Sequence, residues 1–262
     1  MGADVLLFGA AFLGGVVNSI AGGGTLITFP ALLYFGLPAV TANATSTVAL
    51  VPGSLSAFWA YRSEVRGEGR LLLAMAVPSL VGGILGALAA DRAGDALFAK
   101  LAPLLVLGAT ARFMGQEPLR RWSRSAMGSG VASEQDRRGA SQLAVMAGFQ
   151  LLVALYGGFF GAGIGILMLA ALGVMGLRNI HRMNGLKNLA AVCINGLAAL
   201  TFTLAGRVDW PIASFMVVGG VMGGYSGAIL ARWVGQVVVR RLVIAIGLSI
   251  SGVLFLRLLV QP

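Results

Sequence analysis

Long uncharged apolar runs dominate the chain, and the first is too long for a soluble helix. No charged residue occurs from Val5 to Tyr61, whereas about 20 apolar residues are enough to cross a hydrocarbon core. Reading the apolar runs between charged positions gives five segments in each half. They are Val5–Ile20, Leu26–Leu37, Val40–Tyr61, Leu71–Ala90 and Ala96–Met114, then Leu143–Phe160, Ile164–Leu177, Leu189–Ala205, Pro211–Ala231 and Leu242–Leu256. The pattern predicts an all-α polytopic membrane protein.

Two of these segments are short for a membrane span. Leu26–Leu37 and Ile164–Leu177 reach about 18–21 Å at about 1.5 Å per residue, well below a hydrocarbon core of about 30 Å. We predict that they are half-spans that follow glycine-rich bends. If each forms a re-entrant hairpin with its predecessor, the number of crossings in each half falls but stays odd. The chain then has about eight to ten membrane segments in all.

The second half of the chain repeats the first at a constant offset. A shift of 141 positions, without gaps, aligns identical residues along the whole repeat. The aligned pairs are Gly22 with Gly163, Gly24 with Gly165, Asn43 with Asn184, Arg66 with Arg207, and the block Gly82, Gly83, Gly86 and Ala87 with Gly223, Gly224, Gly227 and Ala228. Because chance matches would not share one register, we infer an internal duplication. The expected domains are a first membrane repeat at 1–114, a cytoplasmic linker at 115–141 and a second membrane repeat at 142–262.

An odd number of crossings in each half inverts the second repeat relative to the first. The positive-inside rule tests this arrangement, because cytoplasmic loops are rich in Lys and Arg. With the arginine-rich linker inside, the other loops predicted inside carry Arg62, Arg66 and Arg70; Arg178, His181 and Arg182; and Arg232, Arg240 and Arg241. The loops predicted outside carry nearly balanced charge, from Asp91, Arg92 and Asp95; Arg207 and Asp209; and Asp4. We therefore predict two inverted repeats, with the linker in the cytoplasm and both termini outside it.

Composition supports the membrane assignment and argues against a soluble protein, a nucleic-acid-binding protein and a cysteine-rich metal protein. Apolar residues make up 58% of the chain and charged residues 11%, and the mean hydropathy is +0.89, which does not describe a solvent-covered surface. The formal charge of +10 would suit nucleic acid, but the basic residues gather in short loops, which membrane topology explains better. Cys193 is the only cysteine and lies in an apolar run, so neither an intrachain disulfide nor a cysteine-rich metal site is expected.

Glycine-rich breaks in the apolar sequence are the first candidates for a binding site. A helix broken inside a membrane is tolerated where it lines a cavity or is buried in protein. Its bare amides and the partial positive charge of the next helix N-terminus suit a small anion. The alternative is close helix packing through small residues. The candidate residues are Asn18, Ser19, Gly22, Gly23, Gly24 and Thr25 at the first break, and Gly161, Gly163 and Gly165 at the second.

The sequence around these breaks resembles a known family. The stretch GGVVNSIAGGGTLITFPALLYFGLPAVTANATSTVAL resembles the first repeat of the TauE/SafE family of sulfite exporters, and GGFFGAGIGILMLAALG with HRMNGLKNLAAVCINGLAAL resembles the second. The resemblance implies inverted repeats and proton-coupled export of sulfite or small organosulfur anions across the bacterial inner membrane. The second repeat departs from the first at two places: Ala171 lies near the position that matches Pro30, and Lys187 and Asn188 stand where the first has Ser46 and Thr47.

A lysine in the apolar sequence is the most informative single residue. Lys187 precedes the uncharged run Leu189–Ala205, and an ammonium there needs a partner or a route to water. Its spacing from Asn184, Asn188 and Asn195 places all four on one helix face. Neutral hydrogen-bond donors would then surround an anion-binding charge. The alternative is snorkelling to the cytoplasmic headgroups, since Lys187 follows closely after the arginine at 182.

The first repeat has a polar cluster of its own. Asn43, Thr45 and Ser46 could line a path, although hydroxyl groups in helices commonly bond to their own backbone. His181 could move protons near neutral pH, but its place among loop arginines favours simple exposure. The predicted segments contain no Asp or Glu that could carry a proton. A proton-coupled transporter of this sequence would therefore carry the proton on the substrate itself.

These observations favour a transporter, and we expect no catalytic residue, cofactor or metal. An integral membrane enzyme would need a nucleophile, a metal cluster or paired carboxylates at membrane depth, and the sequence offers none. A passive anion channel would share the architecture and differ only in whether both gates open together. The expected partners are a small anionic substrate and membrane lipid, without nucleic acid, and a homodimer is left open.

Overall fold

The described part of the chain is built from helices. The computed structural model describes residues 2–126, 140–175, 177 and 179–231, together with positions 244, 245, 248 and 252. Within these ranges there is no β-strand, as the sequence predicted. The elements are α1 (Gly2–Ile20), α2 (Thr25–Tyr34), α3 (Ala39–Tyr61), the 3-10 helix η1 (Arg62–Val65), α4 (Gly69–Ala126), α5 (Ala140–Phe159), α6 (Ile164–Val174), α7 (Ile180–Leu204) and α8 (Trp210–Leu230).

Several helices are long and apolar enough to cross a membrane. Such spans occur at Gly69–Ala111, Gln142–Phe159, Ile180–Leu204 and Trp210–Leu230, and shorter apolar helices occur at Asp4–Ile20, Thr25–Tyr34 and Ile164–Val174. Large apolar side chains are exposed on the outer surface, for example Leu204 at 80% and Val145 at 74%. A surface of this kind is stable against lipid rather than water. The chain is therefore a multi-pass membrane protein, as predicted.

The two short helices follow the predicted breaks. α2 has 10 residues and α6 has 11, so each reaches about 15–17 Å at about 1.5 Å per residue, roughly half of a hydrocarbon core. α1 ends at Ile20 before α2 begins at Thr25, and α5 ends at Phe159 before α6 begins at Ile164. The prediction of half-spans behind glycine bends is confirmed.

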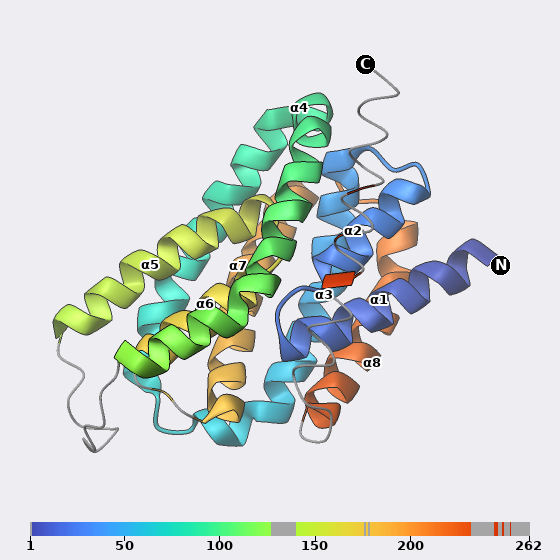
Figure 1. Ribbon diagram of the computed structural model, residues 1–262. Helices are drawn as coiled ribbons and strands as arrows, with labels where there is room; N and C mark the ends of the chain where they lie inside the picture. The colour runs from blue at the N-terminus through green and yellow to red at the C-terminus, as the bar shows by residue number, and fades with distance from the viewer. Residues whose placement is uncertain are drawn as a thin grey trace.

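Helix α4 consists of two arms. Gly94 has φ 70° and ψ 168°, a conformation open to glycine because it has no Cβ, and α4 reverses its direction near the top of Figure 1. The reversal separates the predicted segments Leu71–Ala90 and Ala96–Met114. The second arm stays helical as far as Ala126. The connection between the two halves thus begins with a helical extension that its polar sequence did not indicate.

Some predicted features lie outside the described residues. The segment Leu242–Leu256 is described only at positions 244, 245, 248 and 252. The loop arginines at 137, 138, 178, 232, 240 and 241 are also not described.

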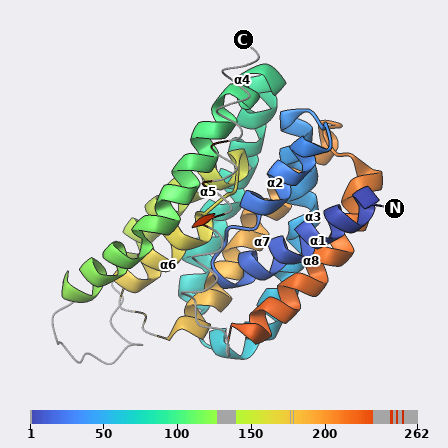
Figure 2. The same cartoon turned by 45° about the vertical axis from the view of Figure 1, so that its right-hand side comes forward.

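Helices from the two halves are interleaved. α3 and α7 pack against each other in the middle of the molecule, α1 lies beside α8 on one flank, and α5 lies beside α4 on the other (Figures 1 and 2). α8 also packs on α3, and α4 packs on α7. Under the 141-residue offset, α1 corresponds to α5, α3 to α7 and the first arm of α4 to α8. Each of these contacts therefore has a counterpart with the halves exchanged, which fits the inferred duplication.

The matched glycine block has the same packing role in both halves. A Cβ on Gly83 would lie 2.5 Å from Ile194 O in α7, and a Cβ on Gly224 would lie 2.7 Å from Gly53 C in α3. Ile194 and Gly53 are themselves related by the same offset. Small residues allow membrane helices to approach this closely, so close packing accounts for this block.

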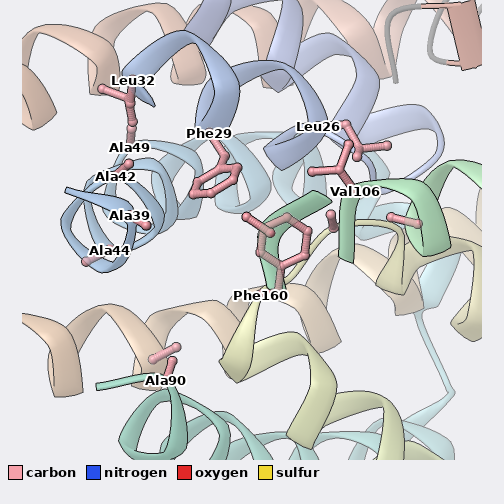
Figure 3. Close-up of a cluster of buried hydrophobic side chains, with 14 of the residues drawn as sticks. Leu26, Phe29, Leu32, Ala39, Ala42, Ala44, Ala49, Ala90, Val106 and Phe160 are labelled. Carbon is pink, nitrogen blue, oxygen red and sulfur yellow. The ribbon is translucent and has the colours of Figure 1, made fainter. Parts of the chain in front are cut away.

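An aromatic cluster ties α2 to the second bend. Phe29 on α2 meets Phe160 edge to face, with ring centroids 5.2 Å apart (Figure 3). Phe98 on α4 lies 6.1 Å from each of them, and all three rings are buried. Aromatic pairs of this geometry contribute about 0.5–1.5 kcal/mol beyond their burial. The second bend is therefore held against the first half by side-chain packing.

Candidate functional site

The two glycine bends meet in the interior. Gly163 N donates a hydrogen bond to Gly22 O at 3.1 Å, and a Cβ on Gly165 would lie 2.6 Å from Gly22 Cα. Gly22, Gly161 and Gly163 have φ of 76°, 79° and 76°, in the region that favours glycine. Both the path of each bend and their close approach depend on glycine. The two bends therefore form one junction.

Helix N-termini at this junction present amides without hydrogen-bond partners. Among the described residues, the N–H groups of Gly23, Gly24 and Thr25 make no hydrogen bond at the start of α2. Those of Ile164 and Gly165 make none at the start of α6. The first amides of a helix lack intrahelical acceptors and carry partial positive charge. The starts of α2 and α6 therefore bring partial positive charge and free N–H groups to the junction.

Lys187 on α7 binds the end of α1. Its side chain is 1% exposed, and Nζ donates to Asn18 O and to Ser19 O at 2.9 Å each. These carbonyls belong to the last turn of α1, where acceptors are free and the partial charge is negative. A Cβ on Gly165 would lie 3.0 Å from Lys187 Cδ, so the lysine stem passes beside the second bend. The snorkelling alternative is wrong, because the ammonium turns inward to these carbonyls.

Asparagines on the two central helices contact the carbonyl ends of the opposite half. Asn43 Nδ2 on α3 donates to the O of Phe159, the last residue of α5, at 3.0 Å. Asn188 Nδ2 on α7 lies 3.5 Å from Ser19 O on α1. Under the 141-residue offset, Phe159 corresponds to Asn18, whose carbonyl accepts from the lysine of α7. The central helix of each half thus caps the broken helix of the other half.

Asn184 and Asn195 complete the polar face of α7. Their side chains are 1% and 8% exposed, so the four residues predicted on one helix face all turn inward. Asn184 Oδ1 is buried without a hydrogen-bond partner in the described chain. At the second bend, a Cβ on Gly161 would lie 3.6 Å from Thr25 Oγ1 and 3.7 Å from Asn195 Oδ1. Residues from α2 and α7 therefore meet at this bend.

The polar residues of the first repeat, Asn43, Thr45 and Ser46, contact different helices. Asn43 reaches the end of α5, whereas Ser46 Oγ lies 2.5 Å from Thr28 Oγ1 and joins α3 to α2. Thr45 Oγ1 accepts from Asp209 N at 3.1 Å, at the start of α8. Thr45 and Ser46 thus join helices, and Ser46 is linked to the first bend through Thr28 Oγ1, which donates to Gly24 O at 3.2 Å.

Two residues near the bends were not singled out from the sequence. The Tyr156 hydroxyl donates to Ala162 O at 2.9 Å, inside the second bend. Ser54 Oγ accepts from Asn18 Nδ2 at 2.8 Å and ties α3 to the end of α1. A tyrosine shortly before a glycine bend and a serine in an apolar helix are weak signals, because both are common in membrane helices.

Ion pairs lie at two ends of the helix bundle. Arg182 at the start of α7 pairs with Glu68, whose side chain is 5% exposed, just before α4. Near the kink of α4, Asp91 accepts from Arg207 Nε at 2.6 Å. This hydrogen bond and the charge of Asp91 raise the pKa of Arg207 above its usual value. The charged loops are thus paired across the sequence halves.

His181 departs from the expectation of simple exposure. The residue is half-buried, and its ring stacks on Tyr61 at a centroid distance of 6.1 Å. The expectation was wrong because the end of α3 packs over the first turn of α7, a contact that loop composition does not reveal.

Comparisons with known proteins agree with the membrane assignment. The family profile described as sulfite exporter TauE/SafE matches residues 7–254. A probable membrane transporter protein of Haemophilus influenzae is 28% identical over 96% of this chain and 95% of its own length. The probable membrane transporter protein YfcA of Escherichia coli K12 is 29% identical over 94% of this chain and 87% of its own, and the probable membrane transporter protein ORF9 of a Sinorhizobium species is 29% identical over 98% and 92%. No solved structure matches this chain closely enough for comparison. Since the profile covers nearly the whole chain, the protein belongs to the sulfite exporter TauE/SafE family of membrane transporters.

Proposed function

We propose that this chain exports a small anion, sulfite or a small organosulfur anion, by alternating access driven by protons. The observation that carries the proposal is the junction of two broken helices, where α2 and α6 both begin beside the contact of Gly22 with Gly163. Helix N-termini bind oxyanions because their free N–H groups and partial positive charge point at the ligand. Transporters with discontinuous helices use such ends to hold the anionic group of a substrate.

The charged side chains near the junction favour an anion over a cation. Lys187 is a buried cation beside the bends, and the lysine has three N–H groups, of which two bind carbonyls in the described chain. The third can meet a substrate. Among the described residues, the buried carboxylate is Glu68, which pairs with Arg182 at one end of the bundle. The family description points to an oxyanion of sulfur. The proposed binding groups are the amides of Gly23, Gly24, Thr25, Ile164 and Gly165 and the side chains of Asn184, Lys187 and Asn188. The amides of Gly22 and Gly163 already donate to backbone carbonyls.

Contacts between the halves suggest how the junction opens to one side at a time. The central helices α3 and α7 each hold the broken helix of the opposite half, so a rocking motion would loosen one hold and keep the other. The pair of Glu68 with Arg182 closes one end of the bundle, and the pair of Asp91 with Arg207 closes the other. We assign these two pairs as gate contacts.

The proposed setting is a bacterial inner membrane, with the linker at 115–141 in the cytoplasm and both termini periplasmic. The loop charges support this orientation. Aromatic side chains at the two ends of the helices indicate where the membrane interfaces lie, since tyrosine and tryptophan favour both interfaces. Tyr34 and Trp210 are 73% and 53% exposed near the proposed periplasmic side. Trp59 is 60% exposed at the other end of α3, with the Arg62 guanidinium 4.5 Å above its ring. Lipid is the proposed neighbour of the exposed apolar faces, and a homodimer is compatible with them.

Flux in reconstituted vesicles tests the proposal. Proteoliposomes should move sulfite, and an imposed pH gradient should drive its accumulation on the alkaline side. Unlabelled sulfite on the far side should accelerate uptake of labelled sulfite through a carrier, whereas a passive channel would show no such acceleration. An enzyme would change the chemical identity of sulfite, which ion chromatography of the vesicle contents detects. Protein-free vesicles give the background. A preference for neutral or cationic solutes, or no flux of sulfite, sulfoacetate, thiosulfate or small carboxylates, overturns the proposal.

A further inference from the structure

Two buried acceptors without donors belong to asparagines that contact the helix ends just before the two bends. Asn43 Oδ1 and Asn188 Oδ1 are buried and have no hydrogen-bond partner in the described chain, and the two residues are 1% and 0% exposed. Buried polar atoms in folded proteins nearly always have a hydrogen-bond partner, so each exception needs an explanation. For an acceptor atom, the missing partner is a hydrogen-bond donor.

The hydrogen bond that each amide nitrogen makes identifies the unpaired atom as the oxygen. Asn43 Nδ2 donates to Phe159 O at 3.0 Å, and only the nitrogen of an amide can donate to a carbonyl. Asn188 Nδ2 faces Ser19 O in the same way at 3.5 Å. The free atom is therefore the amide oxygen in both side chains, and rotating either amide would place two oxygens together.

The two acceptors flank the junction from opposite halves. Phe159 is the last residue of α5, just before the second bend, and Ser19 lies in the last turn of α1, just before the first. The unpaired amides of Gly23 and Gly24 lie just before α2, on the other side of the first bend. The junction thus offers free donors and free acceptors together, and a ligand that satisfies both must itself carry an acceptor and a donor.

We propose that this site recognises an oxyanion in its protonated, singly charged form, with one O–H group. The inference rests on the proposed function and names the ionic state of the substrate. The ionised oxygens accept from the amides of α2 and α6 and from the Lys187 ammonium, and the O–H donates to Asn43 Oδ1 or Asn188 Oδ1. A fully ionised oxyanion has only acceptors, so it would leave the asparagine oxygens unpaired beside its own negative oxygens, which costs affinity.

This recognition couples the anion to a proton without a titrating carboxylate in the protein. The bound species enters with one proton on oxygen, crosses with it, and loses it to water on the far side when it ionises again. In the described chain, the titratable side chains that contact the bends or the helix ends beside them are Lys187 on α7 and Tyr156 on α5. Neither is a carboxylate. The proton therefore travels as part of the substrate.

A matched pair of anions tests the proposal on the purified full-length protein. Hydrogen sulfite carries one ionisable proton, whereas methanesulfonate has the same single charge and the same number of oxygens but has no hydroxyl group and carries a methyl group on sulfur. Binding of each is measured by calorimetry across a pH series that spans the ionisation of hydrogen sulfite. We expect hydrogen sulfite to bind at least about tenfold more tightly, since methanesulfonate leaves a buried acceptor unpaired. The affinity for total sulfite should fall as pH rises, and it should fall more steeply than the affinity for methanesulfonate.

Two substitutions test which side chain causes the preference for hydrogen sulfite. Asn43→Leu should shrink the preference for hydrogen sulfite, whereas Gln150→Leu should keep it. Gln150 is a matched control because its Oε1 is also buried without a partner, while its Nε2 binds Ser79 Oγ at 2.8 Å on α4. If Asn43→Leu does not fold, the two anions on the unaltered protein decide the question.

The outcomes separate this inference from the function on which it rests. Sulfite affinity that rises with pH, or equal binding of sulfite and methanesulfonate, overturns the protonated form but leaves an anion transporter in place. Binding of neither anion, together with no anion flux, overturns the proposed function. The inference is supported if hydrogen sulfite binds more tightly than methanesulfonate and if the affinity for sulfite falls as pH rises. The Gln150→Leu variant should show the same preference and the same pH dependence as the unaltered protein. If water alone occupied the acceptors, the two anions would bind equally.

Discussion

Replacing Gly22 by alanine tests whether the two bends touch through their backbones. Gly22 has φ 76°, where a residue with a Cβ is strained by about 1–2 kcal/mol. The new Cβ would also lie 2.7 Å from Gly165 N, against about 3.5–4.0 Å for a relaxed contact between carbon atoms. The bends would have to separate by roughly 1 Å, which weakens the hydrogen bond from Gly163 N to Gly22 O.

Gly36 offers a matched control for the strain. Its φ is 85°, and an added Cβ would meet nothing within 4 Å, so Gly36→Ala carries the backbone strain alone. Gly22→Ala adds overpacking of about 1–3 kcal/mol and the loss of a hydrogen bond of about 0.5–1.5 kcal/mol. We therefore expect the free energy of unfolding to fall by about 2–4 kcal/mol more for Gly22→Ala than for Gly36→Ala.

Denaturant titration in detergent micelles measures the difference. The single cysteine, Cys193, is partly buried in α7, so the rate at which a thiol reagent labels it reports unfolding. Sulfite binding by the folded fraction should also be lost in Gly22→Ala and kept in Gly36→Ala. Equal destabilisation by the two substitutions would refute the close contact between the bends.

Three further perturbations give distinct outcomes. Lys187→Gln should weaken anion binding about ten- to a hundredfold in calorimetry, because a charge-assisted hydrogen bond contributes about 1.5–3 kcal/mol, and Lys187→Arg should lose less; unchanged affinity would leave the lysine only the role of capping α1. On a chain whose native cysteine is replaced, single cysteines at Ala93 and Ser133 should react with impermeant reagents from opposite faces of sealed vesicles, and labelling of both from one face would contradict the inverted repeats. Glu68→Gln should lower the free energy of unfolding by about 3–5 kcal/mol, because it leaves Arg182 without its buried partner; reversing the charges at both positions should recover part of the loss, and a neutral effect of the single change would show that the pair does not form.

The sequence predicted the features that depend on local pattern. Three consecutive glycines, Gly22 to Gly24, inside an uncharged run indicated a break, and the structure has one between α1 and α2. The spacing of Asn184, Lys187 and Asn188 indicated one inward face of α7, and all three are buried. Such features can be predicted because helix periodicity and the conformational range of glycine act over a few residues.

The contacts that decide the role of Lys187 could not be predicted. Its acceptors, Asn18 O and Ser19 O, are 169 and 168 residues away in the sequence, and no spacing rule connects them. The proximity of Lys187 to loop arginines suggested snorkelling, a local argument that a distant helix end overrides. The helical extension to Ala126 was missed for a related reason, since polar sequence can continue a helix whose backbone bonds are internal.

The pairing of α1 with α8 has a consequence for biosynthesis. A Cβ on Gly15 would lie 2.5 Å from Gly220 O, so the small-residue face of α1 fits a helix that is translated near the end of the described chain. At about 5–20 residues per second, α1 waits roughly 10–40 s for α8 to leave the ribosome. During that time the Gly15 side of α1 lacks the helix that covers it in the folded protein. A nascent chain that stalls before α8 would therefore leave an orphaned helix, a target for membrane proteases, however well the first half is synthesised.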